Sequence, residues 1–148
     1  MSVRRVVATG TFDILHPGHL YYLEESKKLG DELWVIVARD ANVKHKPRPI
    51  IPEGHRLQMV AALKPVDHAI LGDKTDMFHP IREIQPVIIT IGFNQHFDEE
   101  KLRHQLTERG LAPEIIRIGK YADEDLCSSR FVVQRIIDVR GKKDDIQE

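Results

Sequence analysis

Short apolar runs alternate with segments of helical periodicity along this chain. Five such runs span residues 5–9, 32–38, 68–72, 87–92 and 114–119, and most of them lack the polar alternation of a half-exposed sheet. Continuous apolar runs of this length are typical of parallel strands that are covered on both faces. The pattern therefore predicts five buried strands.

The segments between these runs have the apolar spacing and the end signals of helices. We expect helices over residues 17–29, 52–63, 78–84, 98–109 and 128–139. Glycine or proline follows the first four, as is usual where a helix ends. The last one starts at Ser128 and Ser129, which are favourable capping residues, and carries Phe131, Val132, Ile136 and Val139.

Strands that alternate with helices predict an α/β fold with right-handed crossovers. We expect a Rossmann-like, doubly wound, five-stranded parallel sheet with strand order 3-2-1-4-5. Ligands of such sheets bind at the carboxyl ends of the strands where the order reverses, which places loops 10–19 and 92–98 at the site. A single domain is expected over residues 1–140, followed by a flexible tail over 141–148.

Composition narrows the class of protein and its partners. The 148 residues are 41% hydrophobic and 30% charged, as in soluble globular proteins. The net charge of −1 gives no reason to expect nucleic acid or an anionic membrane as a partner. Cys127 is the single cysteine, and no apolar run is long enough to span a membrane. We therefore expect a cytoplasmic protein that acts on small molecules.

The loop after the first strand reads GTFDILHPGH and has the features of an anion site. Gly10 leaves space for a ligand at the strand end, and Pro17 suits the first turn of a helix. Gly18 lets an anion approach the helix start, where free N–H groups and the helix dipole favour phosphate. His16 and His19 are three residues apart, so both can face the same anion.

Two other interpretations of this loop remain open. A four-residue motif recurs by chance, so the loop could be a surface helix start with incidental histidines. A metal site on His16, His19 and Asp13 is the second alternative, although no third-ligand pattern such as HExxH is present. The place of the motif at the first strand–helix junction favours anion binding over both.

Several segments together resemble a known family. GTFDILHPGH, LGDELWVIVARD, PEGHRLQMVAALKPVDHAILG and SSRFVVQRI are similar to the motifs of the cytidylyltransferase-like nucleotidyltransferases, which have a Rossmann-like fold. The resemblance covers nearly the whole chain. It implies transfer of a nucleotidyl group from a nucleoside triphosphate to a phosphorylated acceptor, with loss of pyrophosphate.

Within this superfamily the chain resembles the archaeal-type FAD synthases, which are FMN adenylyltransferases. VIVARD, KPRPIIPEGHR, ALKPVDHAILG and FDEEKL carry this resemblance. It implies ATP and FMN as substrates, together with a divalent cation, Mg²⁺. It also suggests a homodimer, for which the sequence shows no interface.

Two alternative functions are weighed against this one. Glycerol-3-phosphate cytidylyltransferases, or related polyol-phosphate enzymes, share HxGH but carry an RTxGISTT-like segment where this chain reads GKYADEDLCSSR. A non-catalytic nucleotide-binding regulatory module is the alternative from another class. The intact His16 and His19 argue against it.

The resemblance implies roles for the residues around the first loop and the segment after the second strand. His16, His19 and Lys46 are expected to be catalytic, stabilising charge on the nucleotide phosphates. Thr11 and Phe12 are expected to supply loop contacts to the nucleotide. Lys44 could fold over the phosphates with Lys46, although a solvated basic loop is the simpler alternative.

Three residues are candidates for binding the phosphorylated acceptor. Arg56 could grip its phosphate bidentately, or could form a surface ion pair with Glu53 instead. Asp13 could orient the acceptor or a metal-bound water, and Asp40 ends the second strand beside them. No dedicated set of metal ligands is present in the sequence, which is usual where phosphates and water complete the coordination shell.

The remaining candidates lie on the other side of the predicted switch point. Gly92 and Asn94 follow the fourth strand, where an amide could read a base edge, although both also favour turns. Ser128 and Ser129 could cap the last helix and also present its free N–H groups to a triphosphate.

Overall fold

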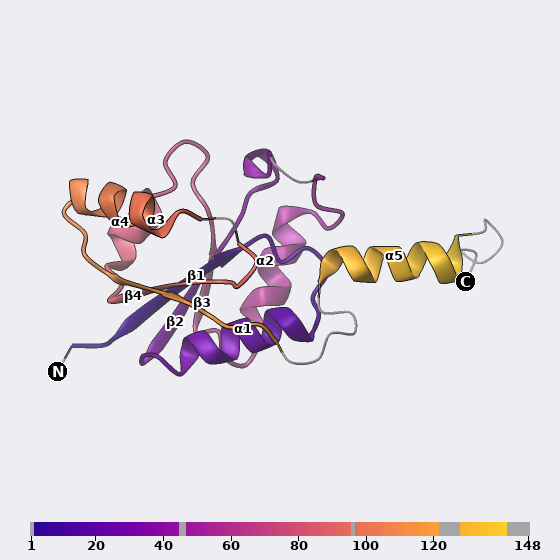
Figure 1. Ribbon diagram of the computed structural model, residues 1–148, viewed down its shortest axis with the longest axis horizontal. Helices are drawn as coiled ribbons and strands as arrows, with labels where there is room; N and C mark the ends of the chain where they lie inside the picture. The colour runs from indigo at the N-terminus through magenta and orange to yellow at the C-terminus, as the bar shows by residue number, and fades with distance from the viewer. Residues whose placement is uncertain (1, 45–46, 96, 122–127, 142–148) are drawn as a thin grey trace.

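Five parallel strands form the centre of the structure (Figure 1). The computed structural model describes residues 2–44, 47–95, 97–121 and 128–141. The sheet has the order β3-β2-β1-β4-β5. Its strands are β1 (Arg5–Gly10), β2 (Glu32–Val37), β3 (His68–Leu71), β4 (Ile88–Ile91) and β5 (Glu114–Arg117). The predicted fold class and strand order are confirmed, and each strand lies within one or two residues of its predicted bounds.

Helices connect the strands where the sequence predicts them. They are α1 (Pro17–Lys27), α2 (Glu53–Ala61), α3 (His79–Ile84), α4 (Glu99–Glu108) and α5 (Ser129–Arg140). A short 3₁₀ turn, η1 (Asp40–Asn42), follows β2 and was not predicted. Because α1 and α2 pack on one face of the sheet and α3 and α4 on the other, the strands are buried on both sides.

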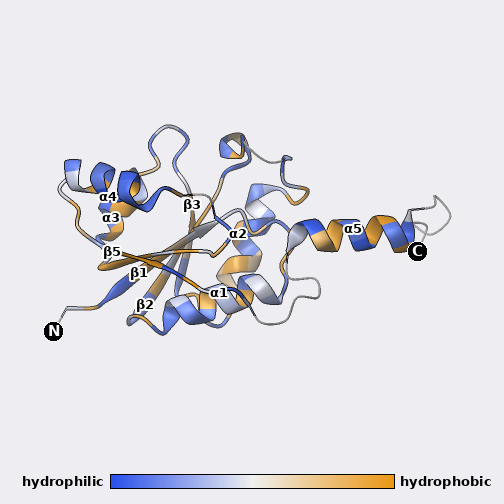
Figure 2. Cartoon of the chain, in the orientation of Figure 1, coloured by the Kyte–Doolittle hydropathy of each residue, from blue (hydrophilic) through white to orange (hydrophobic). Residues whose placement is uncertain are grey.

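Two apolar clusters hold these layers together. Val6 and Val7 are adjacent in β1, both fully buried, and they belong to opposite clusters. Leu23 of α1 and Val60 of α2 pack in the first cluster, and Leu106 of α4 packs in the second. Figure 2 shows many apolar residues along the central strands, and a mixture of polar and apolar residues along the helices. Burial of these side chains is the main stabilising term for the fold.

A buried set of hydroxyl groups fixes α1 against the sheet. Tyr22 Oη donates to the carbonyl of Thr90 at 2.8 Å, and the hydroxyls of Ser26 and Thr90 are also 2.8 Å apart. Ser26 and Thr90 are fully buried, so each hydroxyl needs a partner in the protein. Burial raises the pKa of Tyr22 to about 12, so its hydroxyl stays protonated and can donate at neutral pH.

The last helix, α5, extends away from the sheet (Figure 1), and none of its residues is buried. Phe131, Ile136 and Val139 are 46%, 50% and 60% exposed. Apolar periodicity therefore predicted the helix correctly, but these three side chains belong to neither apolar cluster of the described residues. The one-domain organisation over 1–140 stays a prediction, and residues 142–148 of the expected tail lie outside the described residues.

This difference in burial predicts different costs of substitution on two helices. Ile136→Ser on α5 should change the free energy of unfolding by no more than about 0.5 kcal/mol, as expected for a surface site. Leu106→Ala on α4 removes a side chain that is 1% exposed and should cost about 2–5 kcal/mol. Urea unfolding of both variants measures the contrast. Equal losses would mean that a further surface covers α5 in solution.

Candidate active site

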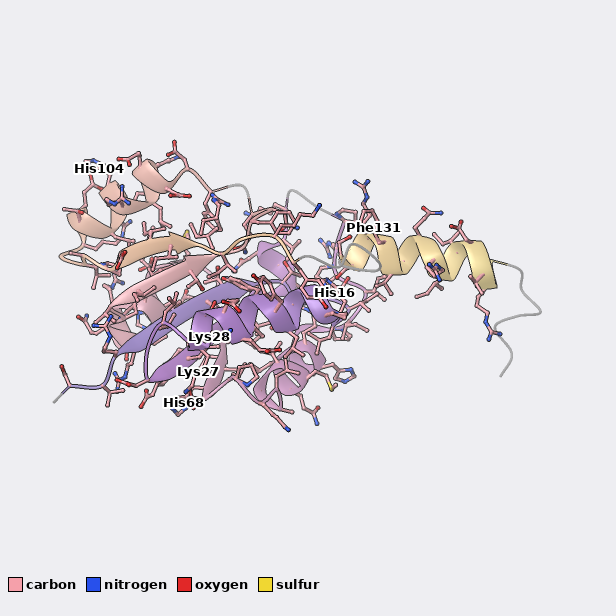
Figure 3. All side chains as sticks on the ribbon, turned by 60° about the horizontal axis from the view of Figure 1, so that its bottom comes forward. His16, Lys27, Lys28, His68, His104 and Phe131 are labelled. Atoms are coloured by element: carbon pink, nitrogen blue, oxygen red, sulfur yellow. The ribbon has the colours of Figure 1, made fainter. Side chains whose placement is uncertain are left out.

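A pocket of about 660 Å³ lies at the carboxyl edge of the sheet, beyond the ends of the neighbouring strands β1 and β4. The loops after β1, β4 and β5 line it, together with the first turns of α1 and α5. Most of the predicted site residues share it: Gly10, Thr11, Phe12, Asp13, His16, Gly18, His19, Gly92, Asn94, Ser128 and Ser129. The other histidines labelled in Figure 3, His68 and His104, lie away from His16.

Phe12 explains why the chain needs glycine at the end of β1. A Cβ at Gly10 would lie 2.9 Å from the Phe12 ring, so the missing side chain makes room for this ring. Phe12 itself has a positive φ of 54° and is 3% exposed. Its ring lies beside that of His19, with centroids 5.2 Å apart. The side chain therefore packs at the base of the pocket that it lines, and its expected contact with the nucleotide stays a prediction.

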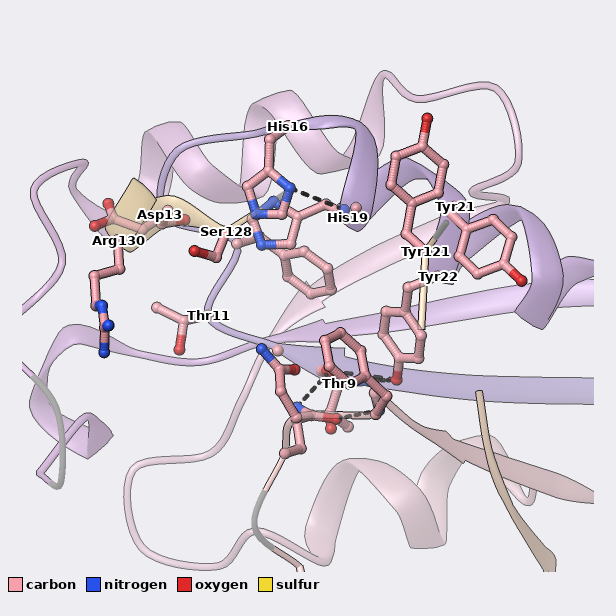
Figure 4. A pocket seen from close by; sticks show the side chains of 18 of the residues that line it. Thr9, Thr11, Asp13, His16, His19, Tyr21, Tyr22, Tyr121, Ser128 and Arg130 are labelled. Carbon is pink, nitrogen blue, oxygen red and sulfur yellow. Dashed lines mark hydrogen bonds between the residues drawn. The ribbon is translucent and has the colours of Figure 1, made fainter. Parts of the chain in front are cut away.

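The two motif histidines lie against one another at the start of α1 (Figure 4). Their ring centroids are 3.8 Å apart with an interplanar angle of 24°. His16 is the N-cap of the helix, with Pro17 in the first turn as predicted. Its Nδ1 accepts a hydrogen bond from the backbone N–H of His19 at 3.3 Å. The capping role of His16 was not predicted.

This capping contact defines the protonation state of His16. An Nδ1 that accepts a hydrogen bond carries no proton, so the neutral ring is protonated at Nε2. Partial burial lowers the pKa of His16 from the ordinary value of 6.5, which favours the neutral ring at pH 7. Neutral His16 therefore has an N–H donor on the ring nitrogen that does not cap the helix.

Asp13 binds backbone groups of the segment that precedes α2. Its two carboxylate oxygens accept hydrogen bonds from the N–H groups of Ile51, at 2.9 Å, and Ile50, at 3.0 Å. We refer to residues 47–51 as the strap. Through these bonds Asp13 holds the strap against the first loop, a structural role that the sequence did not indicate.

Arg56 is buried beneath the first loop and not at the surface of the site. It is 1% exposed, and its guanidinium donates to the carbonyls of Thr11, Ala38 and Ile51 at 2.7 to 2.8 Å. It also forms an ion pair with Asp40.

The position of Arg56 contradicts the expected ion pair with Glu53 and gives no support to the expected contact with the acceptor phosphate. It forms no pair with Glu53, because Glu53 pairs with Arg39 at 3.1 Å. Its donors are directed to protein oxygens, so the acceptor phosphate has no open guanidinium here. Asp40 and Arg56 are not among the residues that line the pocket.

The loop after β4 is held in place by the side chain of Gln95. Its Oε1 accepts from the N–H of Gly92 at 2.7 Å, and its Nε2 donates to the carbonyl of Thr9 at 3.1 Å. Arg117 of β5 donates to the carbonyls of Gly92 and Gln95, each at 2.9 Å. Asn94 is exposed and forms no hydrogen bond with the described part of the chain. Its amide is therefore the one in this loop that can contact a base.

The start of α5 reaches the first loop from the far end of the chain. Ser128 caps the helix by accepting from the N–H of Phe131 at 3.2 Å, as predicted. The hydroxyl of Ser129 donates to the carbonyl of Ile14 at 3.2 Å. Two helix starts, those of α1 and α5, therefore border the same pocket, and their dipoles favour negative charge there.

Several residues of the pocket were not predicted from the sequence. Tyr121 follows β5, and its ring lies 5.3 Å from that of Tyr21 on α1. Arg48 of the strap also lines the pocket. The basic residue within the segment KPRP was the feature of the sequence that could have indicated Arg48 as a site residue. Lys44 is exposed and lies outside the lining, and Lys46 and Cys127 fall outside the described residues.

The described residues contain no group of three His, Cys, Asp or Glu side chains that could hold a metal ion. Asp13, the carboxylate nearest the histidine pair in sequence, accepts hydrogen bonds from the strap. Within this part of the chain, no metal site is formed by protein side chains alone. In the same part of the chain, no helix is long and apolar enough to cross a membrane.

Comparison with known proteins identifies relatives along the whole chain. The family model described as cytidylyltransferase-like matches residues 7–135. A FAD synthase of Methanoregula boonei is 74% identical over 97% of both chains. A FAD synthase of Methanosphaerula palustris is 70% identical over 94% of this chain and 91% of its own.

A solved structure agrees with the observed fold. The lipopolysaccharide core biosynthesis protein from Thermoplasma volcanium superposes with a TM-score of 0.78 at 50% identity. The match covers 81% of this chain and 99% of that protein.

The burial of Arg56 predicts a large effect on stability. Arg56→Met leaves three carbonyls and the Asp40 carboxylate without their donors, so unfolding should be easier by about 3 kcal/mol. Urea unfolding measures this loss. Arg103→Met is the matched control, because Arg103 forms only an exposed pair with Glu100 and its loss should cost less than about 1 kcal/mol. A fully stable Arg56→Met protein with weakened acceptor binding would instead restore the role predicted from the sequence.

Proposed function

The chain belongs to the cytidylyltransferase-like family, and we propose that it is a FAD synthase that transfers AMP from ATP to FMN. The products are FAD and pyrophosphate. The observation that carries this proposal is the identity of 60–74% with archaeal FAD synthases over nearly the whole chain. The pocket supports it, because a histidine pair and two helix starts surround one space that suits a nucleotide.

The reaction replaces one bond to the α-phosphorus of ATP by another. A phosphate oxygen of FMN attacks this phosphorus, and the bond to the bridging oxygen of pyrophosphate breaks. Such transfers depend on positioning and on neutralising charge, with little covalent help from the protein. The Nε2–H of neutral His16 is a donor for a phosphate oxygen, and His19, stacked on it, is the second histidine of the pair.

The two sides of the pocket suit different parts of the substrates. The starts of α1 and α5 favour the triphosphate, with the N–H groups near Gly18 and Ser129 as its neighbours. Asn94 suits the adenine edge, since an amide offers both a donor and an acceptor. The rings of Tyr21 and Tyr121 provide apolar surface for a planar ring.

Four further points belong to this proposal. Mg²⁺ accompanies ATP and is held by phosphate oxygens and water, which suits a pocket without a ligand cluster among the described residues. Lys46 contacts the phosphates.

The protein acts in the cytoplasm, consistent with a single cysteine. It forms a homodimer, which rests on the resemblance to related nucleotidyltransferases and not on any contact surface.

The substrate pair is tested by pyrophosphate release and product identification with each pairing of ATP or CTP with FMN or glycerol 3-phosphate. We expect turnover with ATP and FMN, and FAD as the product. Turnover with CTP and glycerol 3-phosphate alone would replace the proposal by a polyol-phosphate cytidylyltransferase. Nucleotide binding without any turnover would favour a regulatory module.

The dual position of His16, as helix cap and as donor, predicts that two substitutions will separate these roles. Asparagine is a good N-cap but lacks the imidazole, so His16→Asn should keep the stability and lower the rate by about 10²–10³. His16→Ala should lower the rate similarly and also cost about 1 kcal/mol of stability. FAD formation and urea unfolding measure the two effects.

His19→Ala provides the comparison for the second histidine. It should lower the rate by about 10²–10³ as well, since both rings border the same phosphate site. Unchanged rates in His16→Asn and His19→Ala would contradict the histidine mechanism.

A further inference from the structure

Arg48 is a pocket residue whose charge has no partner within the described part of the chain. Its side chain is exposed, and it forms no hydrogen bond or ion pair there. Arg56, which the sequence suggested for a substrate phosphate, is buried and bonded to protein oxygens. Arg48 is therefore an arginine of the pocket whose guanidinium is open to an anionic ligand.

The backbone at Arg48 is restricted before any ligand binds. Pro47 and Pro49 flank it in the strap, and each proline fixes its own φ near −65°. A residue before proline is also confined to extended conformations, which applies to Arg48 itself. Ordering the backbone here costs less on binding, because few conformations remain to be lost.

The strap is also tied to the catalytic loop on its other side. Asp13 accepts from the N–H groups of Ile50 and Ile51, and Arg56 donates to the carbonyl of Ile51 at 2.8 Å. Asp13 lies three residues before His16 in the same loop. The position of Arg48 is thus set relative to the histidine pair through a short series of hydrogen bonds.

We propose that Arg48 binds a substrate phosphate with its guanidinium and that Asp13 is a positioning residue which holds the strap for this contact. The proposal rests on the function proposed above, which brings two phosphate-bearing substrates to this pocket. A guanidinium matches phosphate geometry with two parallel hydrogen bonds, whereas an ammonium acts as a point charge. The phosphate belongs to FMN or to the triphosphate of ATP, and binding measurements distinguish the two.

The test compares Arg48→Gln with the unaltered protein in equilibrium binding. Quenching of flavin fluorescence gives the affinity for FMN and for riboflavin, which lacks the phosphate. Calorimetry gives the affinity for pyrophosphate and for ATP. Loss of a charged, bidentate contact should weaken one phosphate-bearing ligand by about 10- to 100-fold. Arg48→Lys should lose less, since it keeps the charge without the fork.

The pattern of losses identifies the phosphate. Weaker FMN binding with unchanged riboflavin binding assigns Arg48 to the acceptor. Weaker binding of pyrophosphate and ATP assigns it to the nucleotide. Arg103→Gln, on α4 and away from the pocket, controls for the loss of one surface charge. Losses no larger than those of this control, for every ligand, would overturn the proposal.

The role of Asp13 is tested by a double-mutant cycle. Asp13→Asn can accept only one of the two strap N–H groups, so it should weaken the same ligand as Arg48→Gln. If Asp13 acts through Arg48, adding Asp13→Asn to Arg48→Gln should cause no further loss. Additive losses would show that Asp13 does not position Arg48, since a purely structural effect would be independent of that side chain.

Failure of this proposal can be distinguished from failure of the proposed function. FAD formation by the unaltered protein tests the function directly. Pyrophosphate is also the product of a cytidylyltransferase, so its binding still tests Arg48 if FMN is not the acceptor. Unchanged pyrophosphate, ATP and FMN binding in Arg48→Gln, with FAD formed normally, would remove Arg48 and leave the function intact.

Discussion

The buried guanidinium of Arg56 is the contact on which the geometry of the site depends. It binds carbonyls in the loop after β1, at the end of β2 and in the strap, which are distant in sequence. A buried charge is costly unless it is paired and hydrogen-bonded, and Arg56 has both the Asp40 carboxylate and these carbonyls. Because the buried charge needs all of these partners, the three segments must keep fixed positions around Arg56.

A second connection joins the loop after β1, with the start of α1, to the loop after β4. Thr9, next to the end of β1, bonds to both sides: its N–H donates to the hydroxyl oxygen of Tyr22 on α1 at 3.3 Å, and its carbonyl accepts from Gln95 of the loop after β4 at 3.1 Å. Tyr22 also bonds Thr90 in β4, so the helix that carries the histidines is tied to both strands at the switch point. The distance between the histidine pair and the loop after β4 is thus set by hydrogen bonds as well as by the sheet.

Periodicity predicted the strands and helices, because burial on two faces leaves a direct mark on the order of apolar residues. The motif around His16 was found from the sequence, since its residue types and its place at a strand end both carry chemical meaning. The roles of Arg56 and Asp13 were not, because residue type does not tell whether a polar group is already bonded within the fold. Similarly, the apolar pattern of α5 predicted a helix but not the exposure of its apolar side chains.

The polar side chains in and beneath the pocket therefore fall into two groups, those bonded to the protein backbone and those left exposed. The first group forms hydrogen bonds with backbone atoms and fixes the shape of the loops, and it consists of Asp13, Arg56 and Gln95. Arg48 and Asn94 are exposed on loops that those bonds hold, so they can bind a ligand without a large ordering cost. Phosphoryl transfer relies on donors that are in place before charge shifts between oxygens. In this chain the hydrogen bonds of these residues hold the loops of the pocket in place before a ligand binds.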